Sequence, residues 1–396
     1  MSRWRLRLRW SLVAALLVLL AACASGPPLD TVPLSAAGPA GPASPGKPQP
    51  GWSGGASAWS GAVIVQAQSR WVAVPWSDLP GLQEDDLFEA WNAWLKSCER
   101  PGPVFAPLCP QVRQLSIADR AGQLQWMQQQ LQPYRVEPLQ GGPAAGLLTG
   151  YFEPEFEARR LPGDGFSVPL YSPPATLVAG KPWFTRRDID TLPQAQAALR
   201  GKELVYLADP VDALLLQVQG SGRLRVTEPD GQRHLVRLAY AANNGQPYKG
   251  IGRWLLDQGE LRGTVTMQII RAWARMHPER VQQMLDANPR VVFFRAAVLD
   301  HPERGPTGAM GVPLTPLRSV AVDKRQLALG TPLWLSTTVA GQPFAHLVFA
   351  QDVGGAITGS LRADLFFGTG ETAGDAAGRM QSPGRMWVLL PRGLSR

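Results

Sequence analysis

The stretch QDVGGAITGSLRADLFFGTG, residues 351–370, holds two carboxylates, Asp352 and Asp364, among glycines and other small residues. Asp364 begins a short apolar run, DLFF, that predicts a β-strand. In such a strand Asp364 and Phe366 share one face, and the residues between and after them take the other. The stretch contains no histidine, cysteine or lysine. It therefore raises the question of what chemistry an isolated carboxylate could perform there.

The sequence around this stretch is rich in predicted strands. From about residue 308 to the end, runs such as VPLTPLRSVAVD, GTPLWLST and AHLVFAQD alternate with Gly and Pro, which favours a compact barrel over a flat sheet. A similar pattern of predicted short strands separated by turn residues begins after Gly146, with LLTGYFEPEFEARR, ELVYLADP, ALLLQVQGSGRLRV and HLVRLAYAANN. A helical segment at about 250–286 interrupts it, and Pro278 lies in the first turn of its last helix.

The region before residue 146 predicts helices. Apolar residues of 85–98 fall on one helical face, and a second helix is predicted across 112–132, ending before a proline. Trp91 and Trp94 are interpreted as core residues, because their spacing is helical; a platform for sugar rings is the alternative. The run GAVIVQAQSRWVAVPW within 56–80 is compatible with a strand. The length of the chain predicts two domains.

The N-terminus has the pattern of a secretory signal. The first nine residues carry four arginines and no acid, and an apolar run from Leu12 to Leu20 follows. The run is shorter than the ~20 residues that span a bilayer. It leads into Leu-Ala-Ala-Cys, which resembles the bacterial lipobox and predicts a lipoprotein signal peptide at 1–22 with lipidation of Cys23. An ordinary signal peptide is the alternative. Ala24 rather than Asp follows the cysteine, which favours an outer-membrane location facing the periplasm.

Removal of residues 1–22 lowers the formal net charge from +8 to +4, because four arginines are lost. No stripe of Lys and Arg with interleaved aromatic residues is present, so the sequence does not predict nucleic-acid binding. A mild positive charge suits a polyanionic partner such as a cell wall. Residues 23–55, rich in Pro, Gly, Ala and Ser, predict a disordered tether.

The remaining cysteines, Cys98 and Cys109, are candidates for a disulfide in an oxidising compartment. Two buried free thiols are the alternative, since sequence gives no distance between them. The four histidines are scattered and show no metal-ligand spacing. The sequence therefore predicts neither a metal nor another cofactor.

Several motifs resemble one family when they are taken in order. They include TGYFEP, VQGSGRLRV, AYAANNGQPYKGIGRWLLDQGEL and NPRVVFF, followed by three segments that each carry an aspartate. These aspartates are Asp323 in SVAVDKRQLALGTPLWL, Asp352 in QDVGGAI and Asp364 in RADLFFGTG. The ordered set is similar to the membrane-bound lytic murein transglycosylase A family, and with the lipobox it covers nearly the whole chain beyond the tether.

The resemblance implies a mainly β fold with accessory helices. It implies a double-psi β-barrel formed by residues 80–164 and 301–396, and a second β-rich domain inserted at 165–300. A groove between the two domains would bind glycan strands of peptidoglycan. Together with the lipobox, the resemblance places the protein at the outer membrane, and proteins of cell-wall synthesis are further candidate partners.

The resemblance also implies an activity that answers the opening question. A lytic transglycosylase cleaves the β-1,4 bond between MurNAc and GlcNAc and leaves a 1,6-anhydroMurNAc end. The 6-hydroxyl of the sugar attacks, so no water is activated, and one carboxyl group can act first as acid and then as base. Asp364 is the candidate, with a pKa raised by partial burial beside an aromatic ring. Asp352 is either its partner or an Asx-turn residue, and Asp323 is assigned to barrel stability.

Candidate glycan contacts come from two loops and from the segment TGYFEP. Neutral hydrogen-bonding groups and aromatic faces grip sugars, and the residues that offer them here are Gln219, Gly220, Ser221, Gly222, Asn244, Tyr248 and Tyr151. The alternative for the first four is a hairpin turn between strands, and Asn-Gly in the second loop is itself a hairpin signal. Tyr151 is equally compatible with a buried strand position. Glu153 and Glu155 are not assigned a catalytic role.

Two other functions remain open from sequence. An inverting glycoside hydrolase would use Asp364 as acid and Asp352 as base. A wall-binding lipoprotein without activity would have no use for a carboxylate with a raised pKa.

Overall fold

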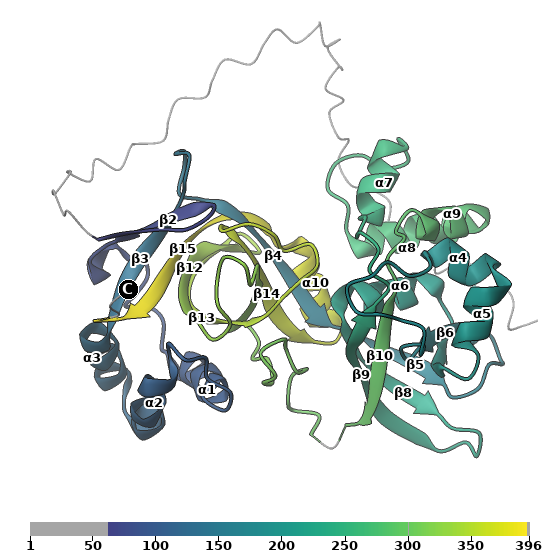
Figure 1. Ribbon diagram of the computed structural model, residues 1–396, viewed down its shortest axis with the longest axis horizontal. Coiled ribbons are helices and arrows are strands. Elements are labelled where there is room, and N and C mark those ends of the chain that lie inside the picture. Colours follow the sequence, from purple (N-terminus) through teal and green to yellow (C-terminus); the bar gives the residue numbers. More distant parts are fainter. Residues whose placement is uncertain (1–61, 300, 394–396) are drawn as a thin grey trace, which may run out of the picture. The chain divides into compact units, whose positions relative to one another are not determined.

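A computed structural model describes residues 62–299 and 301–393 of the chain (Figure 1). The predicted signal peptide at 1–22, the lipidation site Cys23 and the tether at 23–55 lie outside these residues. No helix within the described ranges is long and apolar enough to cross a bilayer.

Six strands close into a barrel in the order β15-β12-β13-β11-β14-β4, and β4 pairs with β15 to complete the ring (Figure 1). Two of the pairs, β11 with β13 and β14 with β4, are parallel. The expected mainly β fold built on a barrel is confirmed. Its strands are β4 (Gly146–Glu153), β11 (Ser319–Val322), β12 (Pro332–Val339), β13 (Gln342–Asp352), β14 (Arg362–Thr369) and β15 (Gln381–Pro391).

The interior of the barrel is filled by alternate side chains of these strands. In β14, Ala363 and Leu365 belong to a buried cluster that also contains Val320 and Val348. Because successive side chains of a strand point to opposite faces, Asp364 lies on the outer face of the barrel wall. The predicted alternation along DLFF is therefore what positions this carboxylate outside the apolar interior.

Three strands extend the sheet beyond the ring, in the order β1-β2-β3 running up to β15. They are β1 (Val63–Val65), β2 (Ser69–Ala73) and β3 (Leu131–Pro138). The long strand β15 makes this possible, because residues 381–384 pair with β4 whereas residues 387–391 pair with β3. The compatibility of GAVIVQAQSRWVAVPW with strand structure is confirmed by β1 and β2.

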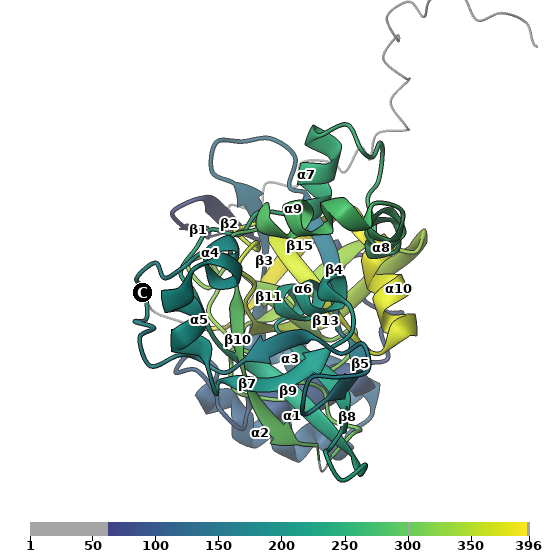
Figure 2. The ribbon, with the colours of Figure 1, turned by 90° about the vertical axis from the view of Figure 1, so that its right-hand side faces the viewer.

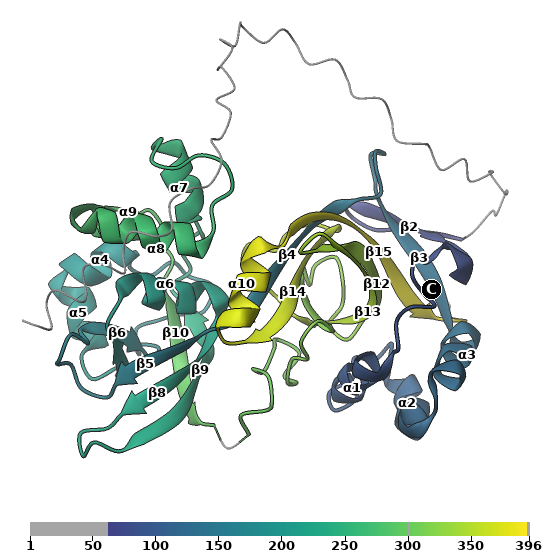
Figure 3. The same cartoon turned by 180° about the vertical axis from the view of Figure 1, so that it is seen from behind.

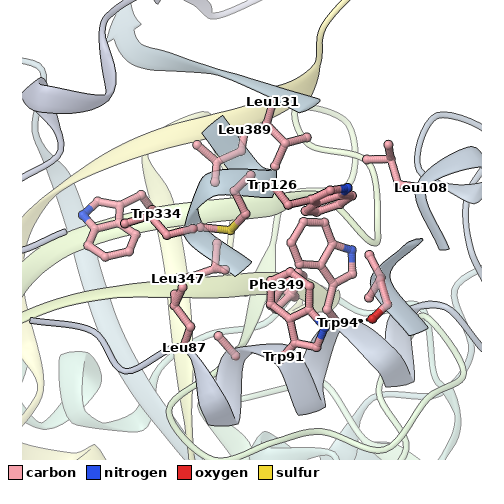
Figure 4. Close-up of a cluster of buried hydrophobic side chains, with 14 of the residues drawn as sticks. Leu87, Trp91, Trp94, Leu108, Trp126, Leu131, Trp334, Leu347, Phe349 and Leu389 are labelled. Carbon is pink, nitrogen blue, oxygen red and sulfur yellow. Dashed lines mark hydrogen bonds between the residues drawn. The ribbon is translucent and has the colours of Figure 1, made fainter. Parts of the chain in front are cut away.

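Helices gather near β3 and form a second core with the barrel wall (Figures 3 and 4). They are α1 (Phe88–Ser97), α2 (Cys109–Gln114) and α3 (Arg120–Gln130), with 3₁₀ turns η1 (Trp76–Asp78), η2 (Ala106–Leu108) and η3 (Leu115–Ile117). Trp91 and Trp94 are almost fully buried and pack against Trp126 and Phe349. The interpretation of these tryptophans as core residues is confirmed.

The prediction of a single helix across 112–132 is wrong, because the helical structure is interrupted between α2 and α3. Asp119 has an extended backbone and its side chain accepts a hydrogen bond from the backbone N–H of Gly122. Asp is a preferred N-cap residue, so it begins a new helix here. Cys98, at the end of α1, is joined by a disulfide to Cys109, the first residue of α2. Of the two alternatives from sequence, a disulfide or two free thiols, the structure has the disulfide.

A second sheet has the order β10-β9-β8-β5-β7-β6, and most of its strands are labelled in Figure 2. Its edge strands β6 and β10 contact each other. Its strands are β5 (Glu155–Arg159), β6 (Val168–Tyr171), β7 (Glu203–Leu207), β8 (Ser221–Thr227), β9 (Arg233–Asn243) and β10 (Val292–Val298). All lie between residues 155 and 298, so the second β unit that the resemblance implied is present. Its first strand, β5, precedes residue 165, the boundary predicted from sequence.

The expectation that ALLLQVQ forms a strand is wrong. These residues belong to α6 (Pro210–Gln219), which packs against β7 and β8 of the second sheet. Asp209 caps the helix through the N–H of Val211, and Pro210 occupies its first turn. A continuous apolar run is compatible with either a buried strand or a helix buried on most sides, and periodicity alone does not separate them.

The remaining helices accompany the second sheet, except α10, which packs on β4 and β14 of the barrel. The helical segment predicted at about 250–286 is confirmed by α7, α8, η4 and α9, and Pro278 begins η4. The bounds are α4 (Arg186–Thr191), α5 (Pro193–Leu199), α7 (Ile251–Asp257), α8 (Met267–Met276), η4 (Pro278–Arg280), α9 (Val281–Asp286) and α10 (Glu371–Arg379).

Candidate active site

The strand register aligns Asp352 and Asp364 in one row across the outer face of the barrel wall. Ala321 of β11 is paired on one side with Asp352 of β13 and on the other side with Asp364 of β14. Asp364 is paired in turn with Thr149 of β4. Neighbouring strands are ~4.8 Å apart, so the two aspartates lie about two strand spacings, ~10 Å, from each other across a small alanine.

Asp364 lies in a partly buried position and accepts one hydrogen bond from a neighbouring strand. The hydroxyl Oγ1 of Thr149 is 2.5 Å from Oδ1 of Asp364, and Nη2 of Arg362 donates to the same hydroxyl at 2.8 Å. Burial raises the pKa of Asp364 to about 6. The Thr149 hydrogen bond and the charge of Arg362 oppose this rise, and the charge of Asp352 supports it. The carboxyl group is therefore protonated at mildly acidic pH.

Asp352 ends β13 and is held by three donors. Its Oδ1 accepts the backbone N–H groups of Ala309 and Val353, and its Oδ2 accepts the hydroxyl of Tyr151, each at 2.9 Å. Burial raises the pKa of Asp352 against these three hydrogen bonds, which lower it. Both oxygens are therefore engaged by the protein. The sequence offered two roles for Asp352, an Asx-turn residue or a partner of Asp364. The structure combines them, since the carboxylate holds a local loop and also contacts Tyr151, which lies beside Asp364.

Tyr151 connects the two aspartates. Its ring packs against Phe366, with the centroids 5.3 Å apart, and its hydroxyl donates to Asp352. Burial and the charges of Asp352 and Asp364 raise the pKa of Tyr151 well above its ordinary value. The phenol therefore stays neutral and remains a hydrogen-bond donor. Phe366 shares the face of Asp364, as the alternation of the strand predicted.

Asp323 has the structural role that the sequence predicted for it. It follows β11, and its carboxylate accepts hydrogen bonds from the Arg325 side chain and from the backbone N–H groups of Arg325 and Gly359. The Arg325 hydrogen bond is the main cause that holds the pKa of Asp323 well below its usual range. The residue thereby fastens two loops at one end of the barrel.

The segment Gln219 to Gly222 joins α6 to β8 and is not the hairpin turn of the alternative reading. Gln219 accepts the backbone N–H of Phe152, and Gly220 has a left-handed conformation with φ of 78° that ends the helix. A Cβ at Gly222 would lie 2.9 Å from Cδ1 of Leu216, so a larger residue there would require the leucine side chain to shift. Ser221 is partly exposed at the start of β8.

The two candidate sugar contacts in the second loop, Asn244 and Tyr248, differ in burial. Asn244 is fully buried, and its amide NH₂ donates to the carbonyls of Phe184 and Pro289 while its oxygen accepts the N–H of Val291. Its polar groups are thus used within the protein, which does not fit the sugar-contact role expected from sequence. Tyr248, by contrast, is exposed. The loop leads from β9 to α7, so Asn-Gly does not mark a hairpin here.

Glu153 is buried and bridges the barrel strand β4 to the second sheet. It accepts hydrogen bonds from Arg223 at 2.8 Å and from Arg237 at 2.6 Å, and the hydroxyl of Thr369 adds a third. Two guanidinium groups and a hydroxyl occupy this carboxylate. These surroundings are those of a structural ion pair, and they agree with the absence of a catalytic role for Glu153 in the sequence prediction.

A cavity of about 230 Å³ lies on the other face of β4, where Gly150 and Phe152 meet α10, α6 and α8. Thr149 and Tyr151 alternate along β4 with the lining residues Gly150 and Phe152. Successive side chains of a strand point to opposite faces, so Thr149 and Tyr151 face Asp364 and point away from the cavity. The hollow is therefore separate from the row of carboxylates.

Sequence reasoning did not single out Thr149 and Arg362. Both stand in motifs that the sequence did highlight, since Thr149 begins TGYFEP and Arg362 begins RADLFFGTG. The contacts of Thr149 with Asp364 and with Arg362 depend on the parallel pairing of β4 with β14, across more than 200 intervening residues. No periodicity in the sequence reports such a register.

Comparisons with known proteins agree with this architecture. Residues 147–295 match the MltA specific insert domain, and residues 318–390 match the 3D domain. The chain is 32% identical to membrane-bound lytic murein transglycosylase A of Vibrio cholerae, over 76% of this chain and 75% of that protein.

Two solved structures are similar as well. The lytic transglycosylase LtgG of Burkholderia pseudomallei shares 42% identity, with a TM-score of 0.56, over 84% of this chain and 98% of that one. Escherichia coli MltA with bound chitohexaose shares 26% identity, with a TM-score of 0.63, over 83% and 94%. The family matches, the extent of the identity to the Vibrio cholerae protein and the shared fold lead to one conclusion: the chain belongs to the membrane-bound lytic murein transglycosylase A family.

Proposed function

We propose that this protein is a lytic transglycosylase that cleaves the β-1,4 bond between MurNAc and GlcNAc in peptidoglycan and forms a 1,6-anhydroMurNAc end. Asp364 donates its proton to the glycosidic oxygen as the bond from C1 to that oxygen breaks. The resulting carboxylate then takes the proton of the 6-hydroxyl, whose oxygen bonds to C1. No water enters the product, and the carboxyl group returns to its starting state.

The observation that carries this proposal is a carboxyl group with a pKa of about 6 on the outer face of the barrel wall. A general acid works best when its pKa lies near the working pH. The second carboxylate of the row, Asp352, has both oxygens occupied by N–H and O–H donors. An inverting hydrolase would need its second carboxylate to hold and activate a water. Three protein hydrogen bonds already hold Asp352 in a structural role, which supports the single-acid mechanism.

Glycan strands would lie in a groove between the barrel and the inserted domain, with Tyr151 and Ser221 among the contacts. We retain Gln219, Gly220 and Gly222 as the framework that places Ser221, and Tyr248 as an exposed aromatic surface. The relative from Escherichia coli binds chitohexaose, which supports recognition of a β-1,4-linked amino-sugar chain by this fold.

The test is product analysis in isotopic water. Purified sacculi are digested in H₂¹⁸O, and the released muropeptides are measured by mass spectrometry. We expect anhydro ends without ¹⁸O. Reducing ends that carry ¹⁸O at C1 would show hydrolysis instead, and the absence of any release would support a binding protein.

The pKa of Asp364 predicts the pH dependence of activity. Because the reaction starts from the protonated acid, kcat/KM should be highest below about pH 6. At higher pH it should fall by about tenfold per pH unit as the acid form is depleted. Initial rates of muropeptide release between pH 4 and 8 measure this decrease, the falling limb of the pH profile. A profile that rises through pH 6 would contradict the assignment of Asp364 as the initial acid.

The membrane attachment is proposed from Cys23, since related proteins are described as membrane-bound. Lipidation at this cysteine would anchor the protein to the outer membrane, facing the periplasm, with 23–55 as a tether. We expect Cys23→Ala to move the protein from the membrane fraction to the soluble periplasmic fraction after cell lysis, and to abolish incorporation of labelled palmitate. Retention of the variant in the membrane fraction would show another means of attachment.

A further inference from the structure

We propose that Arg362 and Thr149 are positioning residues that keep the catalytic proton of Asp364 on one defined oxygen, Oδ2. The inference rests on the proposed function, because it assigns these residues a role in the proton transfer by Asp364. It starts from a short hydrogen-bond chain on the outer face of the barrel wall, which runs from a guanidinium through a hydroxyl to a carboxyl group.

The direction of each hydrogen bond in this chain follows from the chemistry of its groups. A guanidinium has only donors, so Nη2 of Arg362 must donate to Oγ1 of Thr149. The threonine hydroxyl has one hydrogen, which is then directed to Oδ1 of Asp364. Oδ1 is therefore an acceptor in this bond. The proton of the neutral acid belongs on Oδ2, the oxygen without this partner.

The arginine that sets this direction is itself immobilised by both strands. Its Nη1 donates to the carbonyl of Ala363 in β14 at 2.7 Å and to that of Leu147 in β4 at 3.2 Å. The parallel register places Arg362 opposite Leu147 and Asp364 opposite Thr149. The pair of strands thus holds donor, hydroxyl and carboxyl group in a fixed arrangement, which removes a rotational search before the proton transfer.

The same chain also influences the acidity of Asp364. The groups that face this carboxyl are Arg362 on its own strand, Thr149 and Tyr151 on β4, and Asp352 on β13, while β11 contributes only Ala321. The Thr149 hydrogen bond and the Arg362 charge oppose the effect of burial. Without them, the carboxyl would hold its proton more tightly and donate it less readily.

The test compares pH profiles of kcat/KM for muropeptide release. We expect Thr149→Val to move the falling limb upward by about one pH unit, since one hydrogen bond to a charged acceptor corresponds to roughly one to two units. We expect the rate at the optimum to fall by about tenfold, because the proton is no longer confined to one oxygen. Arg362→Gln should move the limb in the same direction.

Two variants serve as matched controls. Thr149→Ser keeps the hydroxyl and should restore the position of the falling limb. Thr337→Val makes the same change on barrel strand β12, where the hydroxyl donates to the carbonyl of Pro383 at 2.9 Å, and should leave the profile unchanged. Circular dichroism and the unfolding midpoint establish that each variant is folded.

The outcomes separate this inference from the function on which it rests. If Asp364→Asn is inactive but Thr149→Val and Arg362→Gln keep the wild-type falling limb, the positioning role is wrong and the proposed function stands. A loss of rate without a shift of the limb would also overturn the inference, because it would indicate a purely structural effect. If Asp364→Asn retains full activity, the proposed function itself fails.

Discussion

Asp364→Asn should lower the rate of muropeptide release by ~100-fold or more, because an amide at this position can neither give nor take the transferred proton. The substitution keeps the size of the side chain and leaves a carbonyl oxygen to accept the Thr149 hydroxyl, so the fold should be preserved. We therefore expect glycan binding to remain. Release of soluble muropeptides from sacculi measures the rate, and calorimetry with chitohexaose measures the binding.

Two further aspartates give this result its control. Asp164→Asn changes a side chain that is 74% exposed and should leave the rate unchanged. Asp352→Asn should cost less than Asp364→Asn, since Asp352 acts on the reaction through Tyr151 and the local charge. Equal losses at the two positions would indicate that the aspartates titrate and act as one coupled pair. Full activity of Asp364→Asn would rule out the mechanism.

The second large effect concerns stability and a buried ion pair. Arg318→Met should lower the free energy of unfolding by ~3–5 kcal/mol, because it leaves the carboxylate of Asp85 buried without its charged partner. In the folded protein both oxygens of Asp85 accept from Arg318 at 2.7 Å, and Oδ2 also accepts the backbone N–H of Leu347. Asp85 is fully buried. Urea denaturation at pH 7 measures the loss.

A matched exposed pair provides the comparison. Arg70 of β2 pairs with Glu137 of β3 while its side chain is 48% exposed, so Arg70→Met should cost at most ~1 kcal/mol. Adding Asp85→Asn to Arg318→Met should recover part of the lost stability, because the buried charge is then removed together with its partner. If Arg318→Met cost no more than Arg70→Met, the pair would not contribute as proposed.

The same pair predicts how stability depends on pH. Burial alone would raise the pKa of Asp85, but the contact with Nδ1 of His346 at 3.4 Å and the hydrogen bonds and charge of Arg318 outweigh it and hold the pKa well below its ordinary value of 3.8. A carboxylate with a depressed folded-state pKa stabilises the protein above the unfolded value and loses this contribution as the pH falls. Asp85 therefore contributes fully at neutral pH, and its contribution decreases below about pH 4.

The sequence by itself determined the family, the mainly β character and the identity of the carboxylates to consider. Short apolar runs separated by Gly and Pro report strands locally, and the alternation in DLFF alone was enough to orient Asp364 with Phe366. Helical spacing likewise identified α1 and the burial of Trp91 and Trp94. These features depend on neighbours within a few positions, so a linear pattern contains them.

Features that depend on contacts between residues far apart in the sequence were decided only by the tertiary structure. ALLLQVQ became helix α6 because the second sheet and helices α7 to α9 together bury its apolar side chains, and Asn244 proved to be hydrogen-bonded inside the protein. The contact of Thr149 with Asp364 arises from the register of β4 against β14. Register is set by the closure of the whole barrel, whose strands come from two segments, 146–153 and 319–391, on either side of the second sheet in the sequence. A one-residue shift would turn each side chain to the opposite face.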